Sequence, residues 1–243
     1  MVGRVSGSEE PALHVEVDGD GPPLVLINGA WCTVRQWDAV VGRLADHFTV
    51  IRHDVRGTGR SEPGPDADNT FETYAADLIG LLDGRGIERA HVWGMAWGAR
   101  VAVMMAATHP DRVDRLVLSD LGITPADIKA QKAGRAAAKE ARAAAGITEV
   151  PPPPGSSDHV DRDAALAALN ATMLHPDLMP YVERIGAPTL IATGEFDPNL
   201  ESSRRALRGL VDGRLDILPL TEHGSVLHRG DAVMATVLPF LLD

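Results

Sequence analysis

HVWGMAWGARVA, residues 91–102, is the stretch of this sequence that decides its fold. A β-rich run leads into Gly94, the chain turns between Gly94 and Gly98, and residues that favour a helix follow. Glycines on both sides of a tight strand-to-helix turn let the neighbouring backbone come close to a strained central residue. Here that central residue is Ala96. Because packed turns also produce a G-x-x-x-G spacing by chance, the surrounding segments decide what the turn means.

Short β-rich runs alternate with longer segments of helical spacing on both sides of this turn. The expected strands are Leu13–Val17, Leu24–Asn28, Thr49–His53, His91–Trp93, Leu116–Ser119, Pro188–Thr193 and Leu215–Leu218. The expected helices are Val34–Asp46, Thr70–Arg85, Trp97–Thr108, Glu201–Leu210 and Asp231–Leu241. The middle strands are nearly continuous apolar runs, as in strands buried on both faces. This alternation predicts the α/β class, with a mostly parallel sheet flanked by helices.

One segment, residues 124–181, interrupts the alternation. It begins alanine-rich and charged, passes through four prolines at 151–154, and then resumes helical spacing. Its first helix has high intrinsic propensity but few large apolar residues, so we expect it to be loosely anchored. An insertion of this size between two strands predicts a short helical cap over a site, within a single domain of residues 1–243. The alternative is a surface excursion with no role.

Composition and charge exclude several classes of function. The 243 residues carry 34 acidic and 23 basic side chains, a net charge of -11, which disfavours nucleic acid and anionic lipid as partners. The single cysteine, Cys32, cannot form an intrachain disulfide and is expected to be a small packed residue. Residues 1–17 lack the apolar core of a signal peptide, and no run is long enough to span a membrane. We therefore expect a cytoplasmic protein, monomer or homodimer, with a small-molecule substrate.

Two further motifs stand where the turn at Ala96 requires them. NGAW, residues 28–31, follows one apolar strand, and DVRGTGRS, residues 54–61, follows the next. Together with residues 94–98 they resemble the α/β-hydrolase superfamily, which has an H-G-type loop, a D-x-R-G-x-G-x-S turn and a G-x-S-x-G nucleophile elbow in this order. The resemblance spans nearly the whole chain. It implies a sheet of about eight strands.

The resemblance also implies three catalytic positions. Ala96 occupies the position of the nucleophile. Asp197, in a G-x-x-D turn after an apolar strand, corresponds to the acid, and His223, just after the last expected strand, corresponds to the general base. The order of elbow, acid and histidine along the chain is that of the superfamily. Glu195 and Asp120 are the alternatives for the acid, and His228 is the alternative for the histidine.

The remaining expectations concern the surroundings of these positions. By the same resemblance, the backbone amides of Ala30 and Trp97 form the oxyanion hole, whose donors typically contribute about 3 kcal/mol each. Many members of the superfamily have histidine at the position of Asn28. A loop that begins with asparagine resembles that of enol-lactonase-like members, which favours esters or lactones of small acids as substrates. No H-x-x-x-H or C-x-x-C pair occurs, so we expect no metal or other cofactor. Candidates for the substrate pocket, each of them equally a candidate for core packing, are Trp31, Leu121, Met173, Leu178 and Met179.

The alanine at position 96 leaves three explanations open. A methyl group cannot attack a carbonyl, so covalent acyl transfer through residue 96 is impossible as the chain is written. The first explanation is a hydrolase of small or medium, largely apolar esters or lactones, inactivated by replacement of its serine. The second is a native alanine enzyme in which His223 and Asp197 perform non-covalent acid–base chemistry, as a lyase, cyclase, isomerase or cofactor-free oxygenase. The third, a protein that only binds its ligand, ranks last.

Overall fold

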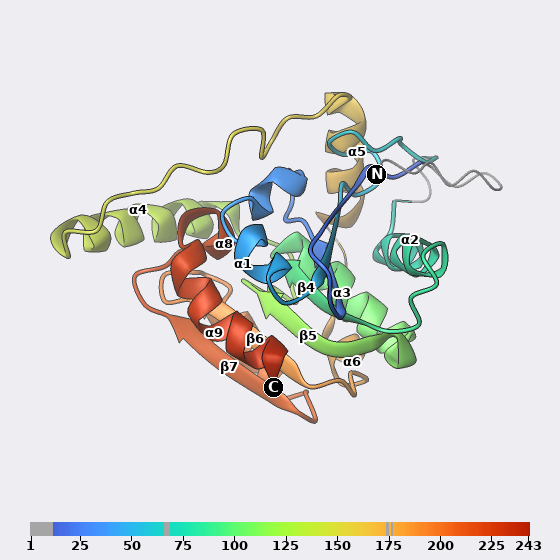
Figure 1. Cartoon of the computed structure of the whole chain (residues 1–243). Helices are drawn as coiled ribbons and strands as arrows, with labels where there is room; N and C mark the ends of the chain where they lie inside the picture. Colours follow the sequence, from blue (N-terminus) through green and yellow to red (C-terminus); the bar gives the residue numbers. More distant parts are fainter. Residues whose placement is uncertain (1–11, 66–68, 174, 176) are drawn as a thin grey trace.

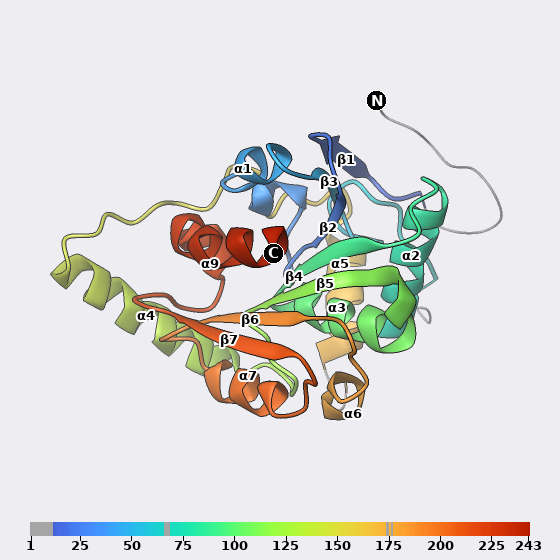
Figure 2. The same ribbon diagram turned by 60° about the horizontal axis from the view of Figure 1, so that its bottom comes forward.

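A computed structural model describes residues 12–65, 69–173, 175 and 177–243. Within these residues seven strands form one sheet in the order β1-β3-β2-β4-β5-β6-β7 (Figures 1 and 2). β1 pairs antiparallel with β3, and every other pairing is parallel. The strands are β1 (Val15–Asp18), β2 (Pro23–Ile27), β3 (Thr49–His53), β4 (Ala90–Met95), β5 (Val113–Ser119), β6 (Thr189–Gly194) and β7 (Gly213–Leu218). The prediction of a mostly parallel sheet flanked by helices is confirmed.

Helices cover both faces of the sheet, and each face has its own apolar core. One core holds buried side chains of α2, α3, α6 and α7, and the other holds those of η1, α1, α8 and α9 (Figure 2). The helices are η1 (Val34–Trp37), α1 (Val41–Ala45), α2 (Phe71–Asp83), α3 (Trp97–Thr108), η3 (Pro110–Arg112), α4 (Ile128–Ala144), α5 (Arg162–Met173), α6 (Met179–Val182), α7 (Leu200–Leu207), α8 (Ser225–His228) and α9 (Gly230–Leu242). No helix in these residues is long and apolar enough to cross a membrane.

One helix is expected over residues 34–46, but the structure has two shorter elements there. It is replaced by the 3-10 turn η1 and the short helix α1. At Val40 the backbone leaves the helical region, with φ of −123°. Both Trp37 and Val40 are fully buried there, so core packing overrides a continuous helix.

Both glycines of the turn around Ala96 are required by close packing. A Cβ at Gly94 would overlap the carbonyl oxygen of Gly98, and a Cβ at Gly98 would overlap the carbonyl oxygen of Ile27. The first contact lets α3 leave β4 sharply, and the second brings the start of α3 against the end of β2. The spacing of these glycines therefore fixes the position of the loop after β2 relative to the start of α3.

The insertion between β5 and β6 does not form one compact cap. Its helices α4 and α5 lie at well-separated places on the molecule and are joined by a long connector, residues 145–161 (Figure 1). The short α6 at its end belongs to the core, where Leu178 and Val182 are buried. The insertion begins and ends side by side, because the amide of Leu178 donates to the carbonyl of Ile123 over 2.9 Å.

Candidate active site

The turn between β4 and α3 holds Ala96 in an unusual backbone conformation. Its φ is 53° and its ψ is −106°, a region that costs a residue with a side chain about 1–3 kcal/mol. The amide of Ala96 donates to the carbonyl of Ser119 over 2.8 Å, which ties the turn to the end of β5. Ala96 itself is buried, so whatever occupies this position lies inside the site and is shielded from bulk water.

Asp197 and His223 come together at the carboxyl ends of β6 and β7. Nδ1 of His223 lies 3.0 Å from Oδ2 of Asp197, at hydrogen-bond distance. The other carboxylate oxygen of Asp197 accepts from the amide of Asn199 over 2.8 Å, so both oxygens are held. The Asp197 side chain is fully buried, whereas that of His223 is 19% exposed and can reach a substrate.

Asp120 lies beside this pair and holds the loop that carries the histidine. It directly follows β5 with a φ of 56° and is fully buried. Its Oδ2 accepts from the amides of Gly224 and Ser225 over 3.0 and 2.7 Å. Its Oδ1 has no hydrogen-bond partner among the described residues. Asp120, Asp197 and His223 each offer one possible metal-ligand atom, and these three atoms lie within 4.8 Å of one another. A shared cation would also tolerate this spacing. We interpret the group as an acid–base cluster, because His223 and Asp197 are already joined to each other.

The two alternatives for the catalytic acid, Glu195 and Asp120, bond to backbone amides and not to His223. Glu195 accepts from the amide of Leu220 over 3.0 Å, and Asp120 accepts from the two amides that follow His223. Of the three carboxylates, Asp197 is the one that lies at hydrogen-bond distance from Nδ1 of His223. The backbone contacts of Glu195 and Asp120 instead hold the loop between β7 and α8.

The electrostatics of the cluster favour protons on it near neutral pH. Burial, reinforced by the negative charge of Asp197, raises the pKa of Asp120 to about 7. Burial alone would lower the pKa of His223, but the hydrogen bond and charge of Asp197 and the charge of Asp120 outweigh it and raise that pKa. The positive charge of Arg135 acts in the opposite direction on His223. The pKa values of both Asp120 and His223 thus lie above their ordinary values, that of Asp120 at about 7.

The backbone amides of Ala30 and Trp97 are available as oxyanion donors. Neither has an acceptor among the described residues, and Trp97 is the first residue of α3, where helical amides have no partner within the helix. Gln36 holds the loop by accepting from the amide of Gly29 over 3.0 Å. Because these donors belong to the backbone, they do not depend on the side chain at position 96.

Asn28, the residue that stands where many relatives have histidine, is turned away from this site. It is fully buried, donates from its side chain to the carbonyl of His53 over 2.9 Å, and accepts from the indole of Trp37 over 2.8 Å. The side chain thus joins the ends of β2 and β3 to η1. Its role in the structure is to fix the start of the loop that holds Ala30.

Trp31 and Trp97 line a small cavity next to the turn. The cavity has a volume of about 10 Å³, comparable to the space that one water molecule needs. Helix α5 closes it with Ala165, Ala168 and Leu169. The indole of Trp97 donates to Oγ1 of Thr172 over 2.7 Å, which fixes α5 over the cavity. A substrate larger than water would need α5 to move.

The other pocket candidates lie elsewhere. Leu121 and Leu178 are buried in the core, and Met179 packs beside α7, where a Cβ at Gly209 would overlap its terminal methyl. Met173 is half-buried near the end of α5. None of the four lines the cavity beside Trp31 and Trp97.

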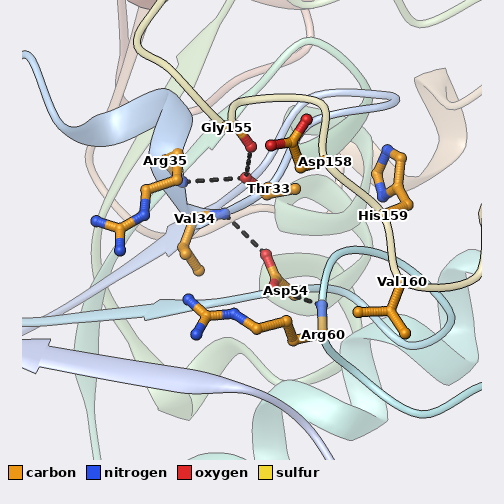
Figure 3. A pocket seen from close by; sticks show the side chains of 9 residues that line it. All are labelled: Thr33, Val34, Arg35, Asp54, Arg60, Gly155, Asp158, His159 and Val160. Atoms are coloured by element: carbon orange, nitrogen blue, oxygen red, sulfur yellow. Dashed lines mark hydrogen bonds between the residues drawn. The ribbon is translucent and has the colours of Figure 1, made fainter.

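A larger surface pocket of about 350 Å³ lies where the connector meets the loops after β2 and β3 (Figure 3). Thr33 joins the two segments: its hydroxyl donates to the carbonyl of Gly155 and its amide to that of Ser156. The carboxylate of Asp54 accepts from the amides of Val34 and Arg60 over 2.8 and 3.0 Å. Neither Ala96 nor His223 lines this pocket. The contacts of Thr33 show how the connector packs against the loop after β2. Its lining residues are Thr33, Val34, Arg35, Asp54, Arg60, Gly155, Asp158, His159 and Val160.

Helix α4 is firmly attached to the acid and histidine loops, so the expectation of loose anchoring is wrong. A Cβ at Gly134 would overlap the carbonyl oxygen of Phe196, the residue before Asp197. Arg142 forms a buried ion pair with Glu222, the residue before His223, and their side chains are only 4% and 2% exposed. Sequence reasoning missed both contacts. The available signal was the glycine inside an alanine-rich helix, which costs about 1 kcal/mol relative to alanine and often marks a close approach.

Comparisons with known proteins agree with the fold. The family model described as alpha/beta hydrolase fold matches residues 22–184. A putative carbamate hydrolase of Caulobacter sp. (strain K31) is 29% identical over 97% of this chain and 97% of its own length. An N-formylmaleamate deformylase of Pseudomonas putida is 34% identical over 49% of this chain and 44% of its own length. Among solved structures, the enol-lactonase of Burkholderia xenovorans LB400 superposes with a TM-score of 0.78 at 27% identity, covering 96% of this chain and 97% of that one.

Proposed function

Because the chain belongs to the alpha/beta hydrolase fold family, we propose that it binds small carboxylic esters or lactones in the site of a hydrolase whose nucleophile position holds alanine. The observation that supports this is the intact His223–Asp197 pair. Its histidine loop and the strained turn at Ala96 are both bonded to the end of β5, through Asp120 and Ser119 respectively. The names of its relatives, a carbamate hydrolase and an enol-lactonase, describe attack on an acyl carbon. A small ester or lactone would enter the cavity beside Trp31 and Trp97 when α5 moves away from it.

As the chain is written, water would have to be the nucleophile. The water oxygen attacks the carbonyl carbon while its proton passes to His223, and Asp197 stabilises the resulting imidazolium. The amides of Ala30 and Trp97 stabilise the negative oxygen of the tetrahedral intermediate. The intermediate then breaks its bond to the alcohol, which leaves with the proton from His223. We expect this route to be slow, because no covalent intermediate divides the reaction into easier steps.

Asp120 supports a second candidate function. A buried carboxyl whose pKa is raised to about 7 can hold or release a proton beside His223. Two adjacent groups with raised pKa values suit a non-covalent proton transfer, such as an isomerisation or an elimination, which needs no nucleophile at position 96. The two candidates differ in their response to a hydroxyl at position 96: it would supply the hydrolase with its nucleophile, whereas proton transfer does not use it.

Ala96→Ser tests the proposed function. The added hydroxyl would be activated by His223, so the serine variant should hydrolyse 4-nitrophenyl esters or small lactones at least about 10³-fold faster than the alanine chain. Steady-state rates across acyl groups of increasing size, with mass spectrometry for the trapped acyl group, measure this. The matched control is Ala96→Ser combined with His223→Ala, which should lose the gain.

Each result separates the candidates. Acylation of the introduced serine hydroxyl supports the hydrolase site. If the serine variant shows neither acylation nor hydrolysis across the panel, the hydrolase proposal fails and proton-transfer chemistry becomes the better account. If the gain persists without His223, the assignment of the general base is wrong.

A further inference from the structure

Helix α4 carries an unusual concentration of positive charge. Lys129, Lys132 and Lys139 are the only lysines in a chain whose net charge is -11, and all three lie on α4 together with Arg135 and Arg142. These five residues recur at intervals of three or four, so they share one face of the helix. Such a stripe gives one side of an otherwise acidic molecule a positive wall.

The contacts of α4 place one edge of this stripe against the acid and histidine loops, while the three lysines are exposed. Gly134 lies against the carbonyl of Phe196, and Arg142 pairs with Glu222 and donates to the carbonyl of Leu220 over 3.0 Å. Arg135 follows Gly134 directly and precedes Arg142 by seven residues, two helical turns, so it is exposed in line with Arg142, at the edge of the face that meets these loops. The helix is held at two points, and Arg135 lies between them along the chain.

Arg135 is the one cation of α4 that both lacks an ion pair among the described residues and acts on His223. Arg142 is paired with Glu222 and Glu149, and Lys139 with Glu149. Arg135 makes no ion pair or hydrogen bond with the rest of the described chain, although it is near enough to His223 for its charge to oppose protonation of that ring. An unpaired cation beside a general base works against the imidazolium that forms in the reaction. A negative group bound between them would remove that conflict.

We infer that Arg135 binds a carboxylate of the substrate, so that the site selects esters or lactones that carry a second, ionised acid group. The ester or lactone part of this inference rests on the proposed function, and the acid group rests on the position and charge of Arg135 on α4. A guanidinium is suited to this role, because its fork of N–H donors matches a carboxylate. Binding the acid group at α4 would also orient the carbonyl of a short substrate towards Ala30 and Trp97.

The test compares a charged with a neutral ester in the Ala96→Ser background. The probes are mono-4-nitrophenyl glutarate and 4-nitrophenyl pentanoate, which have acyl chains of the same length. We expect kcat/KM to favour the glutarate ester, and Arg135→Gln to reduce that preference about 10-fold. Lys139→Gln removes the same charge from the same helix and should keep the preference. Absence of a preference, or an equal loss in both variants, would overturn a specific role for Arg135.

A second measurement needs no turnover. Glutarate is added to the chain with Ala96, and the ring proton of His223, whose charged neighbours are Asp197, Asp120 and Arg135, is followed by NMR against pH. Bound glutarate should raise the pKa of His223 in this chain and in Lys139→Gln, but not in Arg135→Gln. If the serine variant hydrolyses neither ester while this shift occurs, the proposed function fails and the carboxylate site stands. If glutarate leaves the pKa unchanged, the carboxylate site fails.

Discussion

Single residues with a positive φ mark the surroundings of the candidate site. Among the described residues with a side chain they are Trp31, Ala96, Asp120 and Leu220. Each such conformation costs about 1–3 kcal/mol and persists only where surrounding contacts enforce it. Ala96 is held by the carbonyl of Ser119, and the side chain of Asp120 holds the amides after His223. Strain concentrated at loops that meet at one edge of the sheet is typical of a site whose side chains must be held in fixed directions.

Asp120→Asn should change how stability depends on pH. In the folded chain the pKa of Asp120 is raised to about 7, whereas an unfolded aspartate has a pKa of about 3.9. Between these values the folded state binds more protons than the unfolded state, so stability falls as pH rises through this window. Asparagine cannot ionise, so from pH 5 to pH 8 the variant should lose less stability, by on the order of 2–3 kcal/mol.

Urea denaturation at several pH values measures this difference. Asp231→Asn is the control, because the side chain of Asp231 is 79% exposed, and its curve should run parallel to that of the unaltered chain. A parallel curve for Asp120→Asn as well would show that Asp120 is ionised throughout this range.

At the scale of elements, α4 is held by contacts that its amino-acid composition does not predict. It has almost no large apolar side chains, yet a glycine approach and a buried ion pair attach it to two loops. A buried pair such as Arg142–Glu222 is costly to break, because the remaining charge is left without a partner in a dry environment. Residues of the insertion thereby help to position the residue that precedes His223.

Gly134→Ala tests this attachment. Alanine favours helices over glycine by about 1 kcal/mol, but here its Cβ would overlap the carbonyl oxygen of Phe196. We expect a net destabilisation of about 1–3 kcal/mol, as for other overpacked positions, together with slower catalysis in the Ala96→Ser background.

Gly42→Ala is the matched control, because Gly42 lies in α1 with no atom near the position of an added Cβ. It should stabilise the chain by up to about 1 kcal/mol in the same denaturation experiment. Equal effects of the two substitutions would show that α4 does not press on the acid loop.

At the scale of the whole molecule, sequence patterns predict what is local and miss what joins distant segments. Continuous apolar strands and the glycines at 94 and 98 determine the sheet and the turn at Ala96, because strands and turns depend on neighbouring residues. The pairing of His223 with Asp197 follows from two adjacent strands ending at one edge. Arg142–Glu222 joins residues 80 positions apart and leaves no periodic trace. The separation of α4 from α5 likewise depends on where Thr33 docks the connector.

Removal of most of the insertion should leave a folded protein. The amide of Leu178 bonds to the carbonyl of Ile123, so residues 125–176 can be replaced by a Gly-Ser link without pulling β5 and β6 apart. The core residues Leu178 and Val182 are kept. In the Ala96→Ser background the shortened chain should unfold cooperatively at a lower temperature and discriminate less between acyl groups of different size, since α5 no longer closes the cavity.

Thermal unfolding by circular dichroism and kcat/KM over an ester series check both expectations. A second variant that also lacks residues 177–185 is the control and should fail to fold. A shortened chain that folds with unchanged size selectivity would show that α5 has no part in selecting the substrate.

The confinement of every lysine to α4 also decides where a lysine-specific protease can cut. Its cleavage sites are limited to the peptide bonds after Lys129, Lys132 and Lys139, all within one helix. A helix must open locally before a protease can bind its backbone, so the rate of cleavage reports the opening of α4 and of no other element. The folded chain therefore has a built-in reporter for the attachment of this helix, which can be read from the sizes of a few fragments on a gel.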